Sequence, residues 1–180
     1  MAREGGPDAI VLREATRRAG VAPNAAYRHF ADRRALQSEV SAAARGMVAA
    51  AMADEQRQVP PLDDPQEAAR QRMLAVGVAY LRFAQTEPGW FRTAFTVPAT
   101  LSEPTAEGDV NPFALLAEAL DRMVDVGALP PERRAGAEFA AWSSVHGLAM
   151  LVLEGPLRGL DREQRRFAAQ RVLAMVERGL

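Results

Sequence analysis

Hydrophobic residues recur every three or four positions along most of the chain, which is the spacing of one face of an α-helix. Met73, Val76, Tyr80 and Phe83, for example, fall on one face of a predicted helix. Alternating runs of β-branched residues, which would indicate strands, do not occur. The pattern predicts an all-α protein with helices at about 11–19, 23–30, 32–57, 65–86, 88–95, 112–127, 131–154 and 161–178.

Clusters of proline, glycine and aspartate mark the breaks between these helices. Pro60-Pro61 and Pro130-Pro131 interrupt the helical spacing, and the residues 98–111 form the longest predicted loop. Asp63-Asp64 precedes the next helix either as part of a solvated loop or as a favourable charge at the helix N-terminus.

The segment from Leu12 to Leu36 has the layout of a helix, a tight turn, a second helix and the start of a third. Gly20 can end the first helix in the left-handed conformation, because it has no Cβ. Pro23 suits the first turn of the second helix, and Asp32 suits the N-cap of the third. Such a layout places one short helix in the DNA major groove. We therefore predict a helix-turn-helix DNA-binding module at the N-terminal end.

Side-chain positions within this module are predicted from the same layout. Val21 is expected to fill the angle between two helices, and Tyr27 and Phe30 are expected to face inward or along the backbone. Arg33 and Arg34 begin the third helix, where a cation opposes the helix dipole, which favours a phosphate nearby.

The charge of the chain is unevenly distributed, although its net charge is only −1. The first 45 residues hold eight Arg and five acidic residues, a net charge of +3, whereas the remainder holds fourteen Arg and eighteen acidic residues, a net charge of −4. A basic module on an acidic body is typical of a protein that meets phosphate at one end only.

Residues 17–36 resemble the helix-turn-helix of the tetracycline-repressor (TetR) family, because the Ala-Gly-Val turn, the Tyr-Arg-His-Phe end and the capped start of the next helix occur in register. The resemblance implies a transcriptional regulator that binds a palindromic operator in double-stranded DNA, most simply a repressor. It implies base or groove contacts from Asn24, Ala25 and Tyr27 and phosphate contacts from Tyr27, His29 and Arg33, with Arg28 facing outward beside them.

The chain departs from the family pattern in two places. The family often has a hydroxyl side chain where this chain has Val11 and Ala22, so one or two phosphate contacts per subunit are expected to be missing. The family also places a full amphipathic helix before the motif, whereas Gly5-Gly6-Pro7 cannot sustain a helix.

Met1 to Glu4 correspond to the last turn of that first helix, which is truncated or missing. Three or four absent apolar anchors would remove about 5–10 kcal/mol of burial. We expect either that the native chain starts upstream or is trimmed, or that the module is loose; the intact mass of the native protein tests the upstream start.

The predicted body holds a concentration of aromatic side chains. Five of the eleven aromatic residues lie between Tyr80 and Phe95, and methionines add adaptable walls of the kind that promiscuous pockets use. Most of these apolar stripes are expected to be plain core. Part of them is predicted to line a pocket for a small hydrophobic effector.

Two strings of the body, from Phe83 to Phe95 and from Trp142 to Ala149, resemble the WHG-type C-terminal domain of TetR regulators. His146 is either a ligand contact or a histidine that packs helices together, and it is expected to stack on Trp142. The candidate effector contacts are Met73, Tyr80, Phe83, Trp90, Phe95, Phe113, Met123, Trp142 and His146.

The last two predicted helices are apolar on more than one face, so each needs a second packing partner. A homodimer that joins these helices in a four-helix bundle supplies it, and it would space the two reading helices by about 34–36 Å or a small multiple. We predict a DNA-binding module at residues 1–45 and a helical effector-binding and dimerisation domain at 46–180.

Other function classes are poorly supported. The chain has no cysteine, no lysine and two histidines, and it shows neither metal-ligand spacing nor a glycine-rich phosphate loop, so we expect no enzyme, metal or cofactor. No apolar run is long enough to span a bilayer, and a cytoplasmic location is expected. The alternative is a dimeric small-molecule-binding helical protein that has lost DNA binding; a helical enzyme that depends on His146 is a third hypothesis.

Overall fold

The structure, a computed structural model, describes residues 1–22, 27–97 and 111–180. The predicted all-α class is confirmed, because all regular structure in these residues is helical. The described helices are α1 (Ala2–Gly5), α2 (Leu12–Ala19), α4 (Arg33–Gln58), α5 (Pro65–Thr86), α6 (Pro88–Thr96), α7 (Pro112–Asp125), α8 (Ala137–Leu153) and α9 (Arg162–Gly179), with the 3₁₀ turns η1 (Pro7–Ala9) and η2 (Pro131–Arg133).

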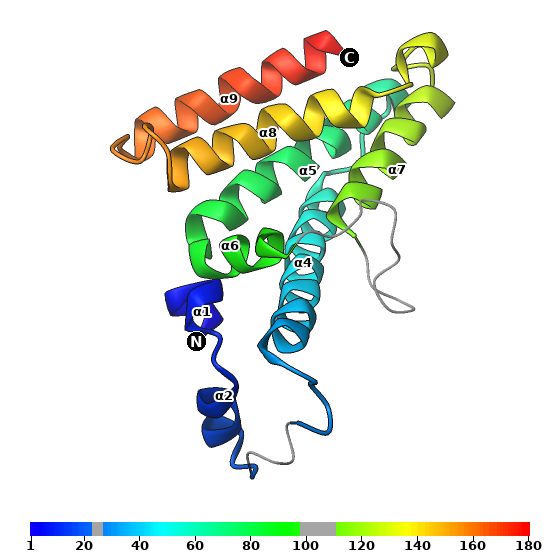
Figure 1. Cartoon of the computed structure of the whole chain (residues 1–180). Coiled ribbons are helices and arrows are strands. Elements are labelled where there is room, and N and C mark those ends of the chain that lie inside the picture. The colour runs from blue at the N-terminus through cyan, green and yellow to red at the C-terminus, as the bar shows by residue number, and fades with distance from the viewer. Residues whose placement is uncertain (23–26, 98–110) are drawn as a thin grey trace.

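A narrow N-terminal end and a broader body are joined by the long helix α4 (Figure 1). This helix has 26 residues, which is about 39 Å at 1.5 Å per residue. It packs on α5, α6 and α7 in the body, and α8 and α9 lie side by side at the opposite edge, where both pack on α5. The boundary predicted between residues 45 and 46 falls inside α4, and the division into 1–45 and 46–180 stays a prediction.

Side-chain caps explain where four of the helices begin. In each case a side-chain oxygen of the N-cap residue accepts a hydrogen bond from a backbone N–H of the first turn, which has no partner within the helix. The caps are Asp32 for α4, Asp64 for α5, Asn111 for α7 and Asp161 for α9. Asp161 and Gln164 form a complete capping box.

Two predicted helices need correction. The helix predicted from residue 131 begins at Ala137, because Pro131 starts a 3₁₀ turn and Gly136 takes a left-handed φ of 77° immediately before the helix. The helix predicted at 23–30 does not reach residue 30: residues 23–26 lie outside the described part of the chain, and Tyr27 to His29 form a turn.

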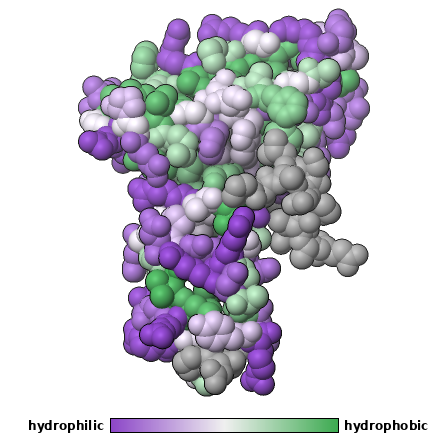
Figure 2. Space-filling model, in the orientation of Figure 1, coloured by the Kyte–Doolittle hydropathy of each residue, from purple (hydrophilic) through white to green (hydrophobic). Residues whose placement is uncertain are grey.

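The buried apolar residues form two clusters. The main core joins α4 to α9 and includes the fully buried Phe91, Met52 and Leu120. The smaller cluster lies in the N-terminal module and consists of Ala2, Ile10, Leu12 and Leu36. The half-buried Trp90 of α6 packs against both clusters. Its side chain therefore connects the core of the N-terminal module with the core of the body. Figure 2 shows hydrophobic surface (green) beside hydrophilic surface (purple) on both parts of the molecule.

Candidate functional site

The helix α2 is capped by backbone at its C-terminus but not by a side chain at its N-terminus. Gly20 ends it with φ 68° and ψ 23°, the left-handed conformation predicted for this glycine. Val11 occupies the N-cap position with an extended backbone, and its apolar side chain makes no cap hydrogen bond. The absence of a hydroxyl at residue 11, noted in the sequence, therefore falls on the cap itself.

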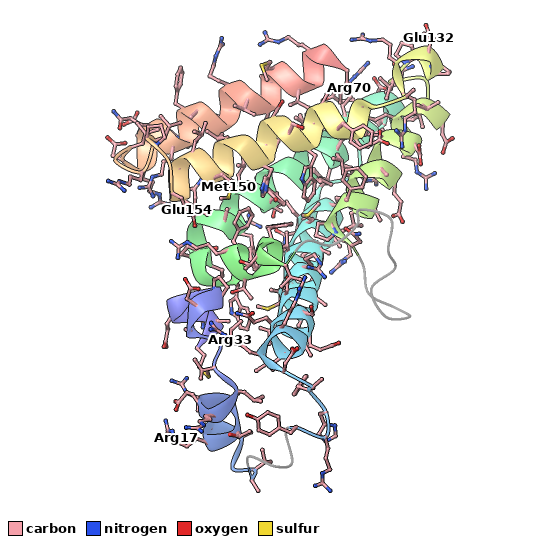
Figure 3. All side chains as sticks on the ribbon, in the orientation of Figure 1. Arg17, Arg33, Arg70, Glu132, Met150 and Glu154 are labelled. Atoms are coloured by element: carbon pink, nitrogen blue, oxygen red, sulfur yellow. The ribbon has the colours of Figure 1, made fainter. Side chains whose placement is uncertain are left out.

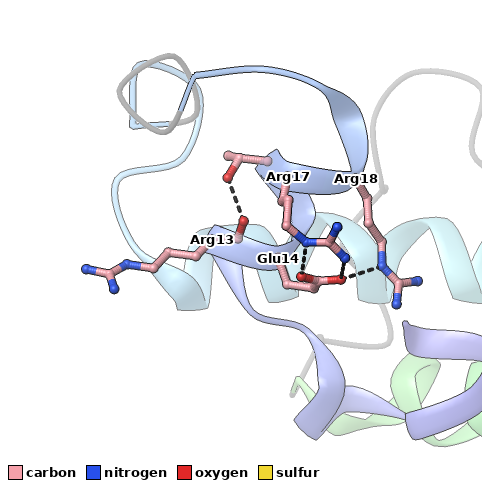
Figure 4. A network of polar contacts seen from close by, with 5 residues as sticks. Arg13, Glu14, Arg17 and Arg18 are labelled. Carbon is pink, nitrogen blue, oxygen red and sulfur yellow. Dashed lines mark hydrogen bonds and ion pairs between the residues drawn. The ribbon is translucent and has the colours of Figure 1, made fainter.

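A polar network covers the exposed face of α2 (Figure 4). The carboxylate of Glu14 accepts two hydrogen bonds from Arg17, at 2.7 and 2.8 Å, and one from Arg18 at 2.8 Å. These bonds stabilise the ionised carboxylate and lower the pKa of Glu14 to about 2. Two of the basic side chains of the module are thus directed toward Glu14.

The residues predicted to contact DNA are only partly described. Asn24 and Ala25 lie outside the described residues. Tyr27, Arg28 and His29 form the exposed turn between α2 and α4. Tyr27 is 57% exposed, so of the two expected orientations, inward or along the backbone, the inward one does not hold, and the DNA role of Tyr27 stays a prediction.

The structure also shows where two further side chains of the module, Val21 and Arg33, lie. Val21, expected to fill the angle between two helices, is 46% exposed, at the rim of a shallow pocket beside Leu12 and Phe30. Arg33 lies between the N-terminal segment and the start of α4 (Figure 3). Its Nε donates to the carbonyl of Ile10 at 3.0 Å, and a terminal nitrogen donates to the carbonyl of Asp8 at 3.2 Å.

The short helix α1 is fixed to α6 by an ion pair and a close backbone contact. The guanidinium of Arg3 donates two hydrogen bonds to the carboxylate of Glu87, at 2.6 and 2.9 Å. A Cβ at Gly89 would lie only 2.1 Å from the carbonyl oxygen of Arg3. Glycine at this position therefore allows the two helices to touch. Sequence reasoning missed this joint, because it depends on residues 84 positions apart.

A second joint connects α4 with the C-terminal part of α6. The buried hydroxyl of Ser41 donates to the carbonyl of Ala94 at 3.0 Å. Arg45 donates to the same carbonyl at 3.1 Å and to the Ser41 oxygen at 2.9 Å. A polar bond in a buried site is strongly directional and costly to break. These bonds connect the C-terminal part of α6 to α4.

A small cavity lies in the middle of the body between α4, α5, α7, α8 and α9. Its volume is about 30 Å³. One water molecule takes up a volume of about this size in liquid water. Four of the predicted effector contacts line it: Met73, Tyr80, Trp142 and His146. The other lining residues are Met52, Leu74, Val76, Gly77, Leu116, Ala141, Val145, Leu173 and Val176.

An aromatic cluster forms one wall of this cavity. The ring of Tyr80 contacts those of Phe91, Phe95 and Trp142, with centroids 5.1 to 5.9 Å apart. Trp142 stacks on His146 with an interplanar angle of 12° and centroids 6.0 Å apart, as expected. Edge and stacked contacts of this kind add to the burial of the rings themselves.

One polar pair lies within the apolar lining. The Tyr80 hydroxyl and His146 Nδ1 are 2.7 Å apart. Burial raises the pKa of Tyr80 and lowers the pKa of His146, because a low-dielectric surrounding disfavours the charged form of each group. The histidine both packs two helices together and faces the cavity.

The remaining predicted effector contacts lie elsewhere in the body. Phe95 and Phe113 contact Trp142 behind the cavity wall. Phe83 and Met123 are buried in the main core and do not line the cavity, and Trp90 packs between the two clusters. Helical spacing alone does not distinguish an aromatic residue of the core from one that lines a cavity. For this reason the sequence assigns all of these residues to one predicted pocket.

The outer faces of α8 and α9 expose large apolar side chains. Phe139 and Leu151 of α8 are 56% and 43% exposed, and Phe167 and Met175 of α9 are 64% and 53% exposed. Both helices were predicted to be apolar on two sides. Single exposed apolar residues are common on protein surfaces, and Phe139 also contacts the ring of Phe113 on α7.

The described residues offer neither a metal site nor a membrane-spanning helix. These residues contain no group of three His, Cys, Asp or Glu side chains that could hold a metal ion. Among their helices, none combines the length and the hydropathy needed to cross a membrane.

Comparison with known proteins gives a family for this architecture. Residues 73–176, which include α7, α8, all but the start of α5 and most of α9, match the family described as "Tetracyclin repressor-like, C-terminal domain". The chain belongs to this TetR-like family. The family assignment agrees with the resemblance found in the N-terminal motif, whereas the WHG type of the C-terminal domain stays a prediction.

The fold of this TetR-like protein is also found among solved structures. A structure titled "Structure of a protein with unknown function from Rhodococcus sp. RHA1" covers 96% of this chain and is itself covered to 86%, with a TM-score of 0.71 and 23% sequence identity. At this identity the likeness concerns the fold alone. No curated protein has significant sequence similarity to the chain.

Proposed function

We propose that this TetR-like protein is a homodimeric transcriptional regulator, a repressor that a small apolar effector releases from a palindromic operator. The observation that carries the proposal is the course of α4. This helix starts at Arg33, directly after the turn that holds Tyr27, Arg28 and His29. Two turns before its end it places Met52 in the cavity lining. One rigid element thus connects the DNA-reading turn with the effector cavity.

The size of the cavity supports a two-state mechanism. A volume of about 30 Å³ is far below the roughly 300–1,000 Å³ of typical ligand pockets, so an effector of that size must bind a geometry in which the surrounding helices have moved. A ligand shifts an equilibrium only by its preference for one state. The closed geometry is then the DNA-binding one. Opening displaces Tyr80, whose ring contacts Phe91 and Phe95 of α6, and the bonds from Ser41 and Arg45 to Ala94 link α6 to α4.

The proposed dimer uses the exposed apolar faces of α8 and α9. Burial of Phe139, Leu151, Phe167 and Met175 against a two-fold copy covers the large hydrophobic side chains that these helices expose. A two-fold axis keeps the two DNA-binding ends at the same level along the axis, one on each side of it.

The test is a titration of the DNA immediately upstream of the gene, at two salt concentrations and with random competitor DNA. We expect tight binding that survives the competitor and weakens steeply with salt. Arg28→Gln is expected to reduce the salt dependence of the dimer by about two released counterions, one for each subunit. Arg70→Gln is the matched control, since Arg70 lies in the body far from the reading turn (Figure 3).

A second candidate, a dimeric small-molecule-binding protein without DNA binding, is favoured by one observation. The apolar cluster that holds the N-terminal module together is built on four small or medium side chains, Ala2, Ile10, Leu12 and Leu36. Binding that is equal for operator and random DNA, combined with binding of a small molecule in the cavity, would select this candidate.

A further inference from the structure

A large open groove lies outside the cavity, between α5 and α9. Its volume is about 700 Å³. Val78, Leu81 and Leu173 give it an apolar floor, and charged and amide side chains form its rim. The groove is on a different face of α9 from Phe167 and Met175, which are absent from its lining, so the proposed dimer contact leaves it free.

The rim of the groove is predominantly cationic. Arg82, Arg162 and Arg166 line it together with one acidic residue, Glu163. Arg82 pairs with Glu55 of α4 at 2.5 Å. In the part of the chain that the structure describes, neither Arg162 nor Arg166 forms an ion pair. Two guanidinium groups are therefore available for an anion.

Leu173 separates this groove from the buried cavity. It is the residue common to the two linings. Its side chain rests on Gly77 of α5, where a Cβ would lie 2.4 Å from Leu173 Cδ2. A glycine inside a helix lowers helix stability, and here it allows α9 to approach α5. Leu173 is therefore the side chain that must move for the two spaces to join.

The cavity itself has no group that suits an anion. The side chains in its lining that carry polar atoms are Tyr80, His146 and Trp142. Tyr80 and His146 already bond each other, burial favours the neutral form of the imidazole, and the indole of Trp142 is uncharged. A carboxylate placed there would lose its hydration without gaining a cation. The apolar part of a ligand fits the cavity, whereas its anionic part fits the groove.

We propose that the effector is an amphipathic anion, with a carboxylate held by Arg162 and Arg166 and an apolar chain or ring that passes Leu173 into the cavity. This inference rests on the proposed effector function and deepens it, because it names the ligand class and the side from which the ligand arrives.

The test compares two probes with the same chain, decanoate and the neutral 1-decanol. Binding is followed by the fluorescence of Trp142 in full-length Trp90→Phe protein, which leaves Trp142 as the single tryptophan. Decanoate is expected to bind more tightly than decanol, and only its affinity should fall with ionic strength. Arg162→Gln with Arg166→Gln should weaken decanoate roughly three- to tenfold and leave decanol unchanged.

A matched pair of arginines provides the control. Arg72 and Arg122 line a different groove, between α4, α5 and α7, which shares no residue with the cavity. Arg72→Gln with Arg122→Gln should therefore leave the decanoate affinity unchanged. Leu173→Ala should speed the association of decanoate in stopped-flow mixing, whereas Val172→Ala, one residue away and outside both linings, should not.

Each contrary outcome has a distinct meaning. Equal affinities for decanoate and decanol, both unaffected by the groove variants, would overturn the anionic class and leave a purely apolar effector. An unchanged association rate for Leu173→Ala would overturn the route past Leu173. Absence of any Trp142 response to either probe would overturn the inference as a whole, while the operator titration decides the regulatory function independently.

Discussion

The hydroxyl of Tyr80 on α5 lies 2.7 Å from Nδ1 of His146 on α8. In an otherwise apolar wall this bond satisfies both polar groups. Tyr80→Phe leaves the imidazole nitrogen without its protein partner, at a cost of about 1–3 kcal/mol in the free energy of unfolding. Urea denaturation of the variant measures this cost, and a variant as stable as the parent would show that the bond contributes nothing net.

The same pair predicts how stability depends on pH. Burial lowers the pKa of His146 below its value of about 6.5 in the unfolded chain. Below pH 6.5 the unfolded chain therefore binds a proton that the folded protein does not, and stability is lost as the pH falls through the folded pKa. Urea midpoints at about pH 7.5 and 5.5 should differ for the parent and for His29→Gln, but less for His146→Gln.

The contact between α1 and α6 predicts a strong effect of one methyl group. Gly89→Ala places a Cβ against the backbone carbonyl of Arg3, and backbone cannot move aside as a side chain can. We expect α1 to detach, with faster amide exchange at residues 2–5 and weaker operator binding. Gly46→Ala in α4 is the control, since a Cβ there meets nothing within 4 Å, and it should stabilise the protein by roughly 0.5–1 kcal/mol.

The uncapped start of α2 predicts a stabilising substitution. Val11→Thr supplies a hydroxyl at an N-cap position whose backbone is already extended, and should raise the stability of the module by about 0.5–2 kcal/mol. The hydroxyl also restores the side-chain type that the family often has there. Thermal unfolding followed through the N-terminal module measures the gain, and Val11→Ala, without the hydroxyl, should not reproduce it.

The exposed apolar faces of α8 and α9 predict the assembly state. Phe167→Arg and Met175→Glu are expected to convert the dimer to a monomer, because each would bury a charge at the contact. Light scattering after size-exclusion chromatography gives the mass. Leu62→Glu changes an apolar residue with 40% exposure in the segment between α4 and α5 and should leave the dimer intact. A parent protein that is monomeric at all concentrations would refute the dimer.

Local features of the fold could be predicted from the sequence because their causes are local. Gly20 ends a helix and Asp32 begins one through atoms within three or four residues. The register of Trp142 and His146 likewise follows from the helical repeat. The error at residues 131–136 arose because a proline that suits the first turn of a helix also suits a 3₁₀ turn, and Gly136 decides between them.

The candidate site could be predicted only in part, because its limits depend on contacts distant in the chain. Met73 and Tyr80 line the cavity, whereas Phe83 lies on the core side of the same helix. The contact between Leu173 and Gly77 could not be predicted from the sequence. A leucine in an amphipathic helix and a glycine between two valines occur in many different structural settings. Only the approach of α9 to α5 shows that the two meet.

The position of Trp90 between the two clusters limits how regulators of this kind can be recombined. The ring of Trp90 packs against the N-terminal cluster although Trp90 belongs to a helix of the body. Its neighbours Glu87 and Gly89 contact Arg3 of α1, so this surface fits the α1 of this chain. A chimera that exchanges only the first 45 residues would pair a foreign helix with this surface. A chimera keeps the joint only if the incoming first helix can pair with Glu87 and bring its backbone against Gly89 in the same way.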